Sequence, residues 1–104
     1  MTRVAFTMKL KPGMKDEYKK RHDEIWPELL VLLRDSGVSD YSIFLDETTD
    51  TLFACQKVSG EGGSQDLGAL PIVQKWWAYM ADIMETNPDN SPVTHFIDEV
   101  FRLD

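Results

Sequence analysis

The sequence predicts an α+β fold in which an antiparallel sheet carries helices on one face. Two patterns alternate along the 104 residues. Apolar side chains at every second position indicate strands, and apolar side chains three or four positions apart indicate helices. Their order is strand–helix–strand–strand–helix–strand, which is the split βαβ or ferredoxin-like arrangement. A chain of this length forms one domain, and we assign residues 1–104 to it.

The first half of the chain predicts one strand and an interrupted helix. Residues 3–10 alternate, with one apolar face formed by Val4, Phe6, Met8 and Leu10. Lys11-Pro12-Gly13 ends this strand, and a helix is expected from about Met14. Pro27 lacks an N–H and clashes with a preceding helical turn, so it suits the first position of a new helix over 27–35. We therefore expect a bend just after His22 that opens toward a cavity.

The second half predicts a hairpin, a helix and a last strand. Residues 38–46 and 51–58 alternate on either side of a short polar turn and indicate a hairpin. A flexible loop over 59–64 and a helical turn over 65–70 follow. Pro71 then begins a helix with an apolar face of Val73, Trp76, Trp77, Met80, Ile83 and Met84. After a polar loop over 87–92, residues 93–103 alternate imperfectly and predict the last strand.

The predicted strands carry apolar side chains on both faces. Phe44, Phe53 and Cys55 lie opposite the face that holds Tyr41 and Ile43. Two helices cover only one face of such a sheet, so the other face is available to a second copy of the chain. The sequence thus predicts a homodimer of packed sheets. Cys55 is expected to be a buried, inert thiol.

Composition excludes several classes of partner. The formal net charge is −7, and a protein this acidic is repelled by nucleic acid and by anionic membrane surfaces. The longest apolar run, 29–33, is too short to span a bilayer. A single cysteine cannot form an internal disulfide, which favours a cytoplasmic location. No residue spacing indicates a metal site, a phosphate-binding loop or a Ser–His–Asp triad.

Tyr18, His22 and Trp26 are the first candidates for a functional site. Positions i and i+4 are about 40° apart around a helix, so these three side chains share one face. An imidazole exchanges protons near neutral pH, which suits general acid or base catalysis. A histidine at a helix bend can also be purely structural, and the spacing alone does not separate these interpretations. His95 belongs to no such group and is interpreted as a surface residue.

Tyr41 and the pair Trp76-Trp77 complete the candidate site. Tyr41 lies on the strand face expected under the helices, where its hydroxyl needs a partner and a ligand could supply one. For Tyr18 or Tyr41 taken alone, a core tyrosine whose hydroxyl reaches solvent is the more common arrangement. Adjacent helical side chains diverge by about 100°, so the two indoles point in different directions. One can fill the core while the other forms the floor of a sugar-binding pocket, although both can equally be core residues.

Four motifs together resemble the L-rhamnose mutarotase family. They are Arg21-His22 with Ile25-Trp26-Pro27-Glu28-Leu29, then Tyr41-Ser42-Ile43-Phe44-Leu45, Gln74-Lys75-Trp76-Trp77-Ala78-Tyr79-Met80, and Asn87-Pro88-Asp89-Asn90-Ser91-Pro92. They occur in the expected order and at the expected separations over nearly the whole chain. One departure is Asp40, where an asparagine is expected.

The resemblance implies a fold, an activity and a set of site residues. The fold is a dimeric α+β barrel, and the activity is interconversion of the α and β anomers of L-rhamnose without a cofactor or metal. The resemblance also implies that His22 is the proton donor and that Tyr18, Tyr41, Trp76 and Trp77 contact the sugar. Two other functions remain open, namely a small dimeric-barrel monooxygenase and a sugar-binding module without catalysis.

Overall fold

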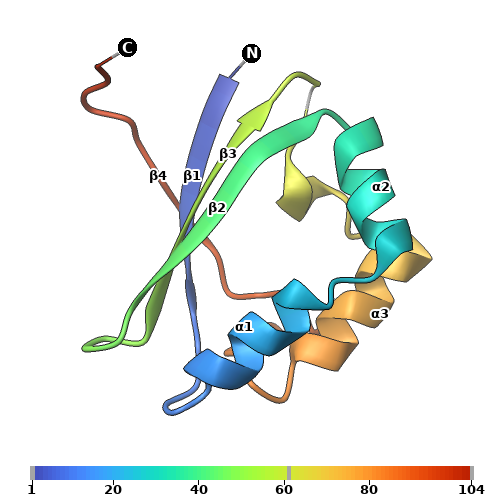
Figure 1. The fold of residues 1–104 in the computed structure, drawn as a ribbon, viewed down its shortest axis with the longest axis vertical. Helices are drawn as coiled ribbons and strands as arrows, with labels where there is room; N and C mark the ends of the chain where they lie inside the picture. The colour runs from blue at the N-terminus through green and yellow to red at the C-terminus, as the bar shows by residue number, and fades with distance from the viewer. Residues whose placement is uncertain (1, 61, 104) are drawn as a thin grey trace.

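A computed structural model describes residues 2–60 and 62–103. Its elements are β1 (Thr2–Lys9), α1 (Lys15–Asp23), α2 (Pro27–Asp35), β2 (Val38–Asp46), β3 (Thr51–Val58), the 3₁₀ helix η1 (Ser64–Asp66), α3 (Pro71–Met80) and β4 (His95–Ile97). Glu61, within the predicted loop 59–64, lies outside the described residues. Figure 1 shows α1, α2 and α3 on the same side of the sheet.

The four strands form one antiparallel sheet in the order β2-β3-β1-β4. The two central strands, β1 and β3, are the first and third along the chain, as the split βαβ arrangement requires. The predicted ferredoxin-like fold with helices on one face is therefore confirmed. No helix in the described part of the chain has both the length and the apolar character needed to cross a membrane.

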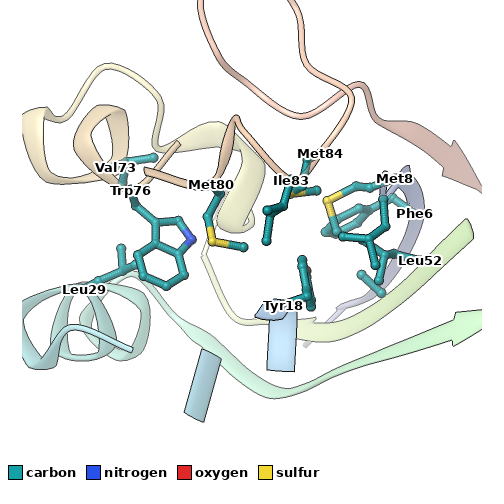
Figure 2. Packing of buried hydrophobic residues seen from close by; sticks show 12 residues of the cluster. Phe6, Met8, Tyr18, Leu29, Leu52, Val73, Trp76, Met80, Ile83 and Met84 are labelled. Atoms are coloured by element: carbon teal, nitrogen blue, oxygen red, sulfur yellow. The ribbon is translucent and has the colours of Figure 1, made fainter. Parts of the chain in front are cut away.

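The two faces of the sheet differ in what covers them. The inner face, toward the helices, forms the core with side chains such as Phe6, Met8 and Leu52, which are at most 4% exposed. Figure 2 shows these three on one side of the core and Val73, Trp76 and Met80 of α3 on the other. On the outer face, Phe44 is 67% exposed and pairs across the strands with Phe53, which is 42% exposed. In the described part of the chain, the outer face therefore exposes two large aromatic side chains.

The helical region breaks where the sequence predicted. α1 ends at Asp23, and Trp26 has an extended backbone with ψ 129° immediately before Pro27, the first residue of α2. The N–H of Ile25 donates to the carbonyl of His22 at 3.2 Å, which satisfies one of the free carbonyls at the end of α1. His22 thus lies in the last turn of a short helix beside the break.

The predicted helix from Pro71 is too long, because α3 ends at Met80. Ile83 and Met84 are buried as expected, at 2% and 5% exposed, but they lie outside the helix. The N–H of Lys11 donates to the carbonyl of Ile83 at 2.8 Å, and Met84 forms an isolated bridge with Leu10. Pairing with the segment after β1 therefore replaces helical hydrogen bonding at these positions.

Three further expectations need correction. The last strand covers only His95–Ile97, which pairs with Ala5–Thr7 of β1, and residues 98–103 are exposed and irregular. The helical turn predicted over 65–70 is the 3₁₀ helix Ser64–Asp66. Cys55 is only partly buried, because it lies on the outer face of the sheet.

Candidate active site

A cavity of about 870 Å³ lies between the helices and the inner face of the sheet. Its volume is in the range typical of small-molecule sites. The walls are largely apolar, from residues such as Leu29, Ile43 and Met80. All five predicted site residues line it, namely Tyr18, His22, Tyr41, Trp76 and Trp77.

His22 is fixed by the residue one helical turn before it. The Nδ1 atom of His22 lies 3.1 Å from the carbonyl oxygen of Tyr18, and a carbonyl can only accept, so Nδ1 carries a hydrogen. The two rings also stack, with centroids 4.2 Å apart and 25° between their planes. Burial lowers the pKa of His22, while the bond to Tyr18 and the charge of Asp23 oppose that shift. In the neutral ring, Nε2 is therefore the nitrogen that can accept a proton.

Trp76 forms the wall beside His22. Its indole meets the imidazole edge-on, with centroids 5.4 Å apart and an interplanar angle of 85°. The indole of Trp26 also meets the indole of Trp76 edge-on, with centroids 5.1 Å apart. Tyr79 packs against both indoles. We call His22, Trp26, Trp76 and Tyr79 the aromatic cluster. Trp26 thus joins the site through Trp76, across the helix break, rather than along the face of α1.

Trp77 points in a different direction from its neighbour, as predicted for adjacent helical positions. Its indole lies against the backbone of Gly68, where an added Cβ atom would lie 2.5 Å from Cη2 of Trp77. A larger residue at this position would have to displace the indole. Trp76 is a core residue and Trp77 is half-buried, and both line the cavity.

A β-bulge brings Tyr41 into the cavity. Ser39 pairs with Lys57 and Ser42 with Cys55, so Asp40 and Tyr41 together lie opposite the single residue Gln56. Asp40 has φ 49°, in the left-handed region that aspartate and asparagine tolerate better than most residues. In a regular strand, Val38 and Tyr41 would lie on opposite faces. The bulge lets both point inward.

A buried polar pair supports the wall next to Tyr41. Gln56 is fully buried; its Nε2 donates to Oγ of Ser64 at 2.8 Å, and its Oε1 accepts from the N–H of Ser64 at 2.9 Å. Ser64 Oγ lies 3.5 Å from the hydroxyl of Tyr41. Burial raises the pKa of both Tyr18 and Tyr41, and the Ser64 contact partly offsets it for Tyr41. Both phenols therefore stay protonated at neutral pH and can donate to a ligand.

The polar loop 87–92 contributes Asn90 and Pro92 to the lining of the cavity. The N–H of Asn87 donates to the carbonyl of Ser91 at 2.8 Å, and its side-chain amide donates to Oγ of Ser91 at 3.0 Å. Asn90 has φ 70°. The sequence pointed to this loop, which includes Asn90, and to Asp40 without assigning either to the site. It did not single out Ser64 or Gln65, which also line the cavity. In residues 2–60 and 62–103, no three His, Cys, Asp or Glu side chains are grouped as metal ligands.

The chain is similar to known proteins over nearly its whole length. A family model described as L-rhamnose mutarotase matches residues 3–103. The chain is 64% identical to an L-rhamnose mutarotase from Formosa agariphila and 65% identical to one from Phocaeicola vulgatus, in each case over 100% of both chains.

Solved structures agree on the fold. The crystal structure of an L-rhamnose mutarotase from Formosa agariphila superposes with a TM-score of 0.93 at 58% identity, covering 100% of both chains. A structure described as a putative antibiotic biosynthesis monooxygenase from Chloroflexus aurantiacus has a TM-score of 0.52 at 16% identity, covering 99% of this chain and 98% of that one. This second likeness concerns the fold alone. By its full-length identity to these relatives, the chain belongs to the L-rhamnose mutarotase family.

Proposed function

We propose that this protein interconverts the α and β anomers of L-rhamnopyranose. Family membership supports the reaction, and the way His22 is held supports its role as the acid. His22 is held by Tyr18 through both Nδ1 and its ring face, in the wall of a cavity that two tyrosines and two tryptophans also line. A rigid imidazole with a defined tautomer is what a positioned proton transfer requires.

The reaction opens the sugar ring and closes it on the other face of the carbonyl. In the proposed mechanism, protonated His22 donates from Nε2 to the ring oxygen as the bond from that oxygen to C1 breaks. A base takes the proton of the anomeric hydroxyl, so that C1 becomes an aldehyde. Rotation about the C1–C2 bond exposes the other face of the aldehyde. On closure the C5 hydroxyl, which holds the former ring oxygen, attacks C1 and returns its proton to His22. The base returns its proton to the anomeric oxygen.

The base is a water molecule or one of the carboxylates of the cavity wall. Asp23 and Asp40 are the carboxylates among the lining residues of the described chain. Asp23 is paired with Lys19 at 2.8 Å, whereas Asp40 lies 3.5 Å from Lys57. Each positioned proton transfer contributes a rate factor of about 10² to 10⁴.

The remaining site residues are proposed to hold the sugar. Tyr18 and Tyr41 donate hydrogen bonds from their protonated hydroxyls to sugar oxygens. Trp76 and Trp77 present indole surfaces to the apolar C–H faces of the pyranose ring. The apolar wall that includes Ile43 and Leu45 suits a sugar whose C6 is a methyl group.

NMR exchange between the α and β anomeric signals of L-rhamnose tests the proposal. Wild-type protein is expected to accelerate the exchange, and His22→Asn to lower the accelerated rate by about 10²- to 10⁴-fold. His95→Asn, the same change at the exposed second histidine, is the matched control and is expected to keep the wild-type rate. Sugar binding without acceleration by wild-type protein would contradict the proposal and indicate a binding module.

We also propose that the active form is a homodimer in the cytoplasm. The outer face of the sheet exposes Phe44 and Phe53, and the segment after β4 exposes Val100, Phe101 and Leu103. Figure 1 shows this segment running away from the helices. Apolar side chains gathered on one face are usually covered by another protein surface, and a second copy supplies a matching one. The single free cysteine supports the cytoplasmic location, and cell fractionation tests it.

A further inference from the structure

We propose that Arg21 is a positioning residue for the proposed reaction: by fastening the end of α1 to the end of α3, it holds His22 against Trp76. The inference rests on the proposed function, because it explains how the proposed acid keeps its place. Arg21 precedes His22 in the sequence, and adjacent helical side chains diverge by about 100°. Arg21 is not among the residues that line the cavity, so it acts through its neighbour.

The guanidinium of Arg21 makes four hydrogen bonds. Its Nε donates to Glu17 at 2.8 Å, within α1. Its Nη1 donates at 2.8 Å both to Oδ1 of Asp82 and to the carbonyl of Tyr79, while Nη2 donates to Oδ2 of Asp82 at 3.2 Å. The bond to Asp82 is therefore bidentate, and it connects residues 61 positions apart. Three of the four bonds join α1 to the last turn of α3 and the segment just after it.

The same guanidinium also contacts the aromatic cluster. Its Cζ lies 4.6 Å from the ring centroid of Tyr79, and Tyr79 packs on Trp76 at 5.8 Å. Trp76 in turn contacts His22 at 5.4 Å. Arg21 and His22 therefore reach the cluster from adjacent positions of α1, one through Tyr79 and the other through Trp76. A displacement of α1 relative to α3 would disturb both contacts together.

Burial separates Arg21 from the other cations of α1. The side chain of Arg21 is 11% exposed, although that of its partner Asp82 is 66% exposed. The side chains of Lys15 and Lys19, which also form ion pairs, are 57% and 73% exposed. Exposed pairs between flexible side chains contribute little, while a planar guanidinium in a bidentate pair fixes geometry. Lysine offers neither the paired donors nor the flat surface that stacks on Tyr79. The Arg21 guanidinium also holds the pKa of Asp82 below its usual range.

The test combines kinetics with NMR titration of the two histidines. In Arg21→Lys and in Asp82→Asn, kcat for anomer exchange is expected to fall about 10- to 100-fold, the effect of a misplaced catalytic group, with KM nearly unchanged. The titration midpoint of the His22 imidazole is expected to rise toward about 6.5 as the ring becomes more solvated, while the His95 signal is unaffected. Circular dichroism confirms that each variant is folded.

Glu47→Gln is the matched control. It breaks the pair between Lys15 and Glu47 at 2.7 Å, which ties the start of α1 to the β2–β3 turn, and leaves the aromatic cluster intact. It is expected to keep the wild-type kcat and the wild-type His22 titration. Wild-type behaviour of Arg21→Lys and Asp82→Asn would overturn the inference, and so would an equal loss in Glu47→Gln. If wild-type protein fails to accelerate exchange but Arg21→Lys still moves the His22 titration alone, the positioning stands and the proposed reaction falls.

Discussion

The imidazole of His22 is held by Tyr18 in two ways. Its Nδ1 lies 3.1 Å from the backbone carbonyl of Tyr18, and its ring stacks on the phenol at 4.2 Å. One contact sets the tautomer and the other sets the plane of the ring. Because both come from one residue of the same helical turn, the orientation of Nε2 does not depend on a bound ligand.

The first prediction concerns pH. Burial lowers the pKa of His22 below 6.5, against the opposing effects of Tyr18 and Asp23. An acid acts only in its protonated form, so kcat should fall as pH rises through that lowered pKa, and His22→Asn should remove this limb of the profile. Anomer exchange measured between pH 4.5 and 8 checks this. A kcat that rises over the same interval would make His22 the base instead.

The second prediction separates the two parts of Tyr18. Tyr18→Phe keeps the stacked ring and the backbone carbonyl but removes the hydroxyl, which is expected to bind the sugar. We expect KM to rise roughly fivefold, the loss of about 1 kcal/mol for one hydrogen bond, with kcat little changed. Tyr18→Ala also removes the stack, so kcat should fall as well. Equal losses of kcat in both variants would assign the hydroxyl a role in the chemical step.

The third prediction concerns the bulge at Asp40. Asp40→Gly and Asp40→Asn tolerate φ 49°, whereas Asp40→Ala is strained by about 1–2 kcal/mol. For a domain of this size, each 1 kcal/mol lowers Tm by about 4–8 °C. Thermal unfolding should therefore show the loss in the alanine variant alone. Lys57→Met removes the ion pair between Lys57 and Asp40 without changing the bulge. An equal loss of Tm in Lys57→Met would attribute the effect to the lost charge.

The fourth prediction concerns the contact between Gly68 and Trp77. A methyl group at Gly68 would lie 2.5 Å from Cη2 of Trp77, so Gly68→Ala must displace the indole. We expect KM for L-rhamnose to rise roughly fivefold, for a loss of about 1 kcal/mol. In a Trp77→Leu background the same substitution should have little further effect, which a double-mutant cycle measures. If the effects of Gly68→Ala and Trp77→Leu on KM were additive, Gly68→Ala would act through another part of the loop and not through Trp77.

The fifth prediction concerns the outer face of the sheet. Phe53→Glu puts a charge at the centre of the face proposed to meet a second copy, and analytical ultracentrifugation should show monomers. Val31→Glu is the control, because Val31 is 55% exposed on α2, among the helices. A wild-type protein that sediments as a monomer would refute the dimer, as would dissociation by both variants.

Much of the fold follows from local patterns that the sequence displays. Strict alternation identified three strands, and Pro27 marked the break after His22 because its missing N–H allows few positions in a helix. Tyr18 and His22 were paired by the four-residue helical repeat. The different directions of Trp76 and Trp77 follow from the rotation between adjacent residues of an α-helix and do not depend on the rest of the fold.

What the sequence did not predict depends on contacts between distant residues. Apolar spacing reports burial, and Ile83 and Met84 are buried without being helical because they pair with the segment after β1. The last strand pairs with β1 over only three residues, His95–Ile97, although the alternation of the sequence continues to residue 103. The bulge at Asp40 has no local signal beyond a residue that tolerates positive φ. The bond from Arg21 to Asp82 joins residues that only the packing of α1 on α3 brings together.

The early end of α1 has an electrostatic consequence for His22. The aligned peptide dipoles of a helix leave partial negative charge at its carbonyl end, which favours a cation in the last turn. His22 lies in that turn, and the neighbouring positive charge of Arg21 is matched by Glu17 and Asp82. A helix that continued through Pro27 would have moved this negative end about one turn away. By stopping at Asp23, the helix stabilises the imidazolium in a cavity whose apolar walls oppose it.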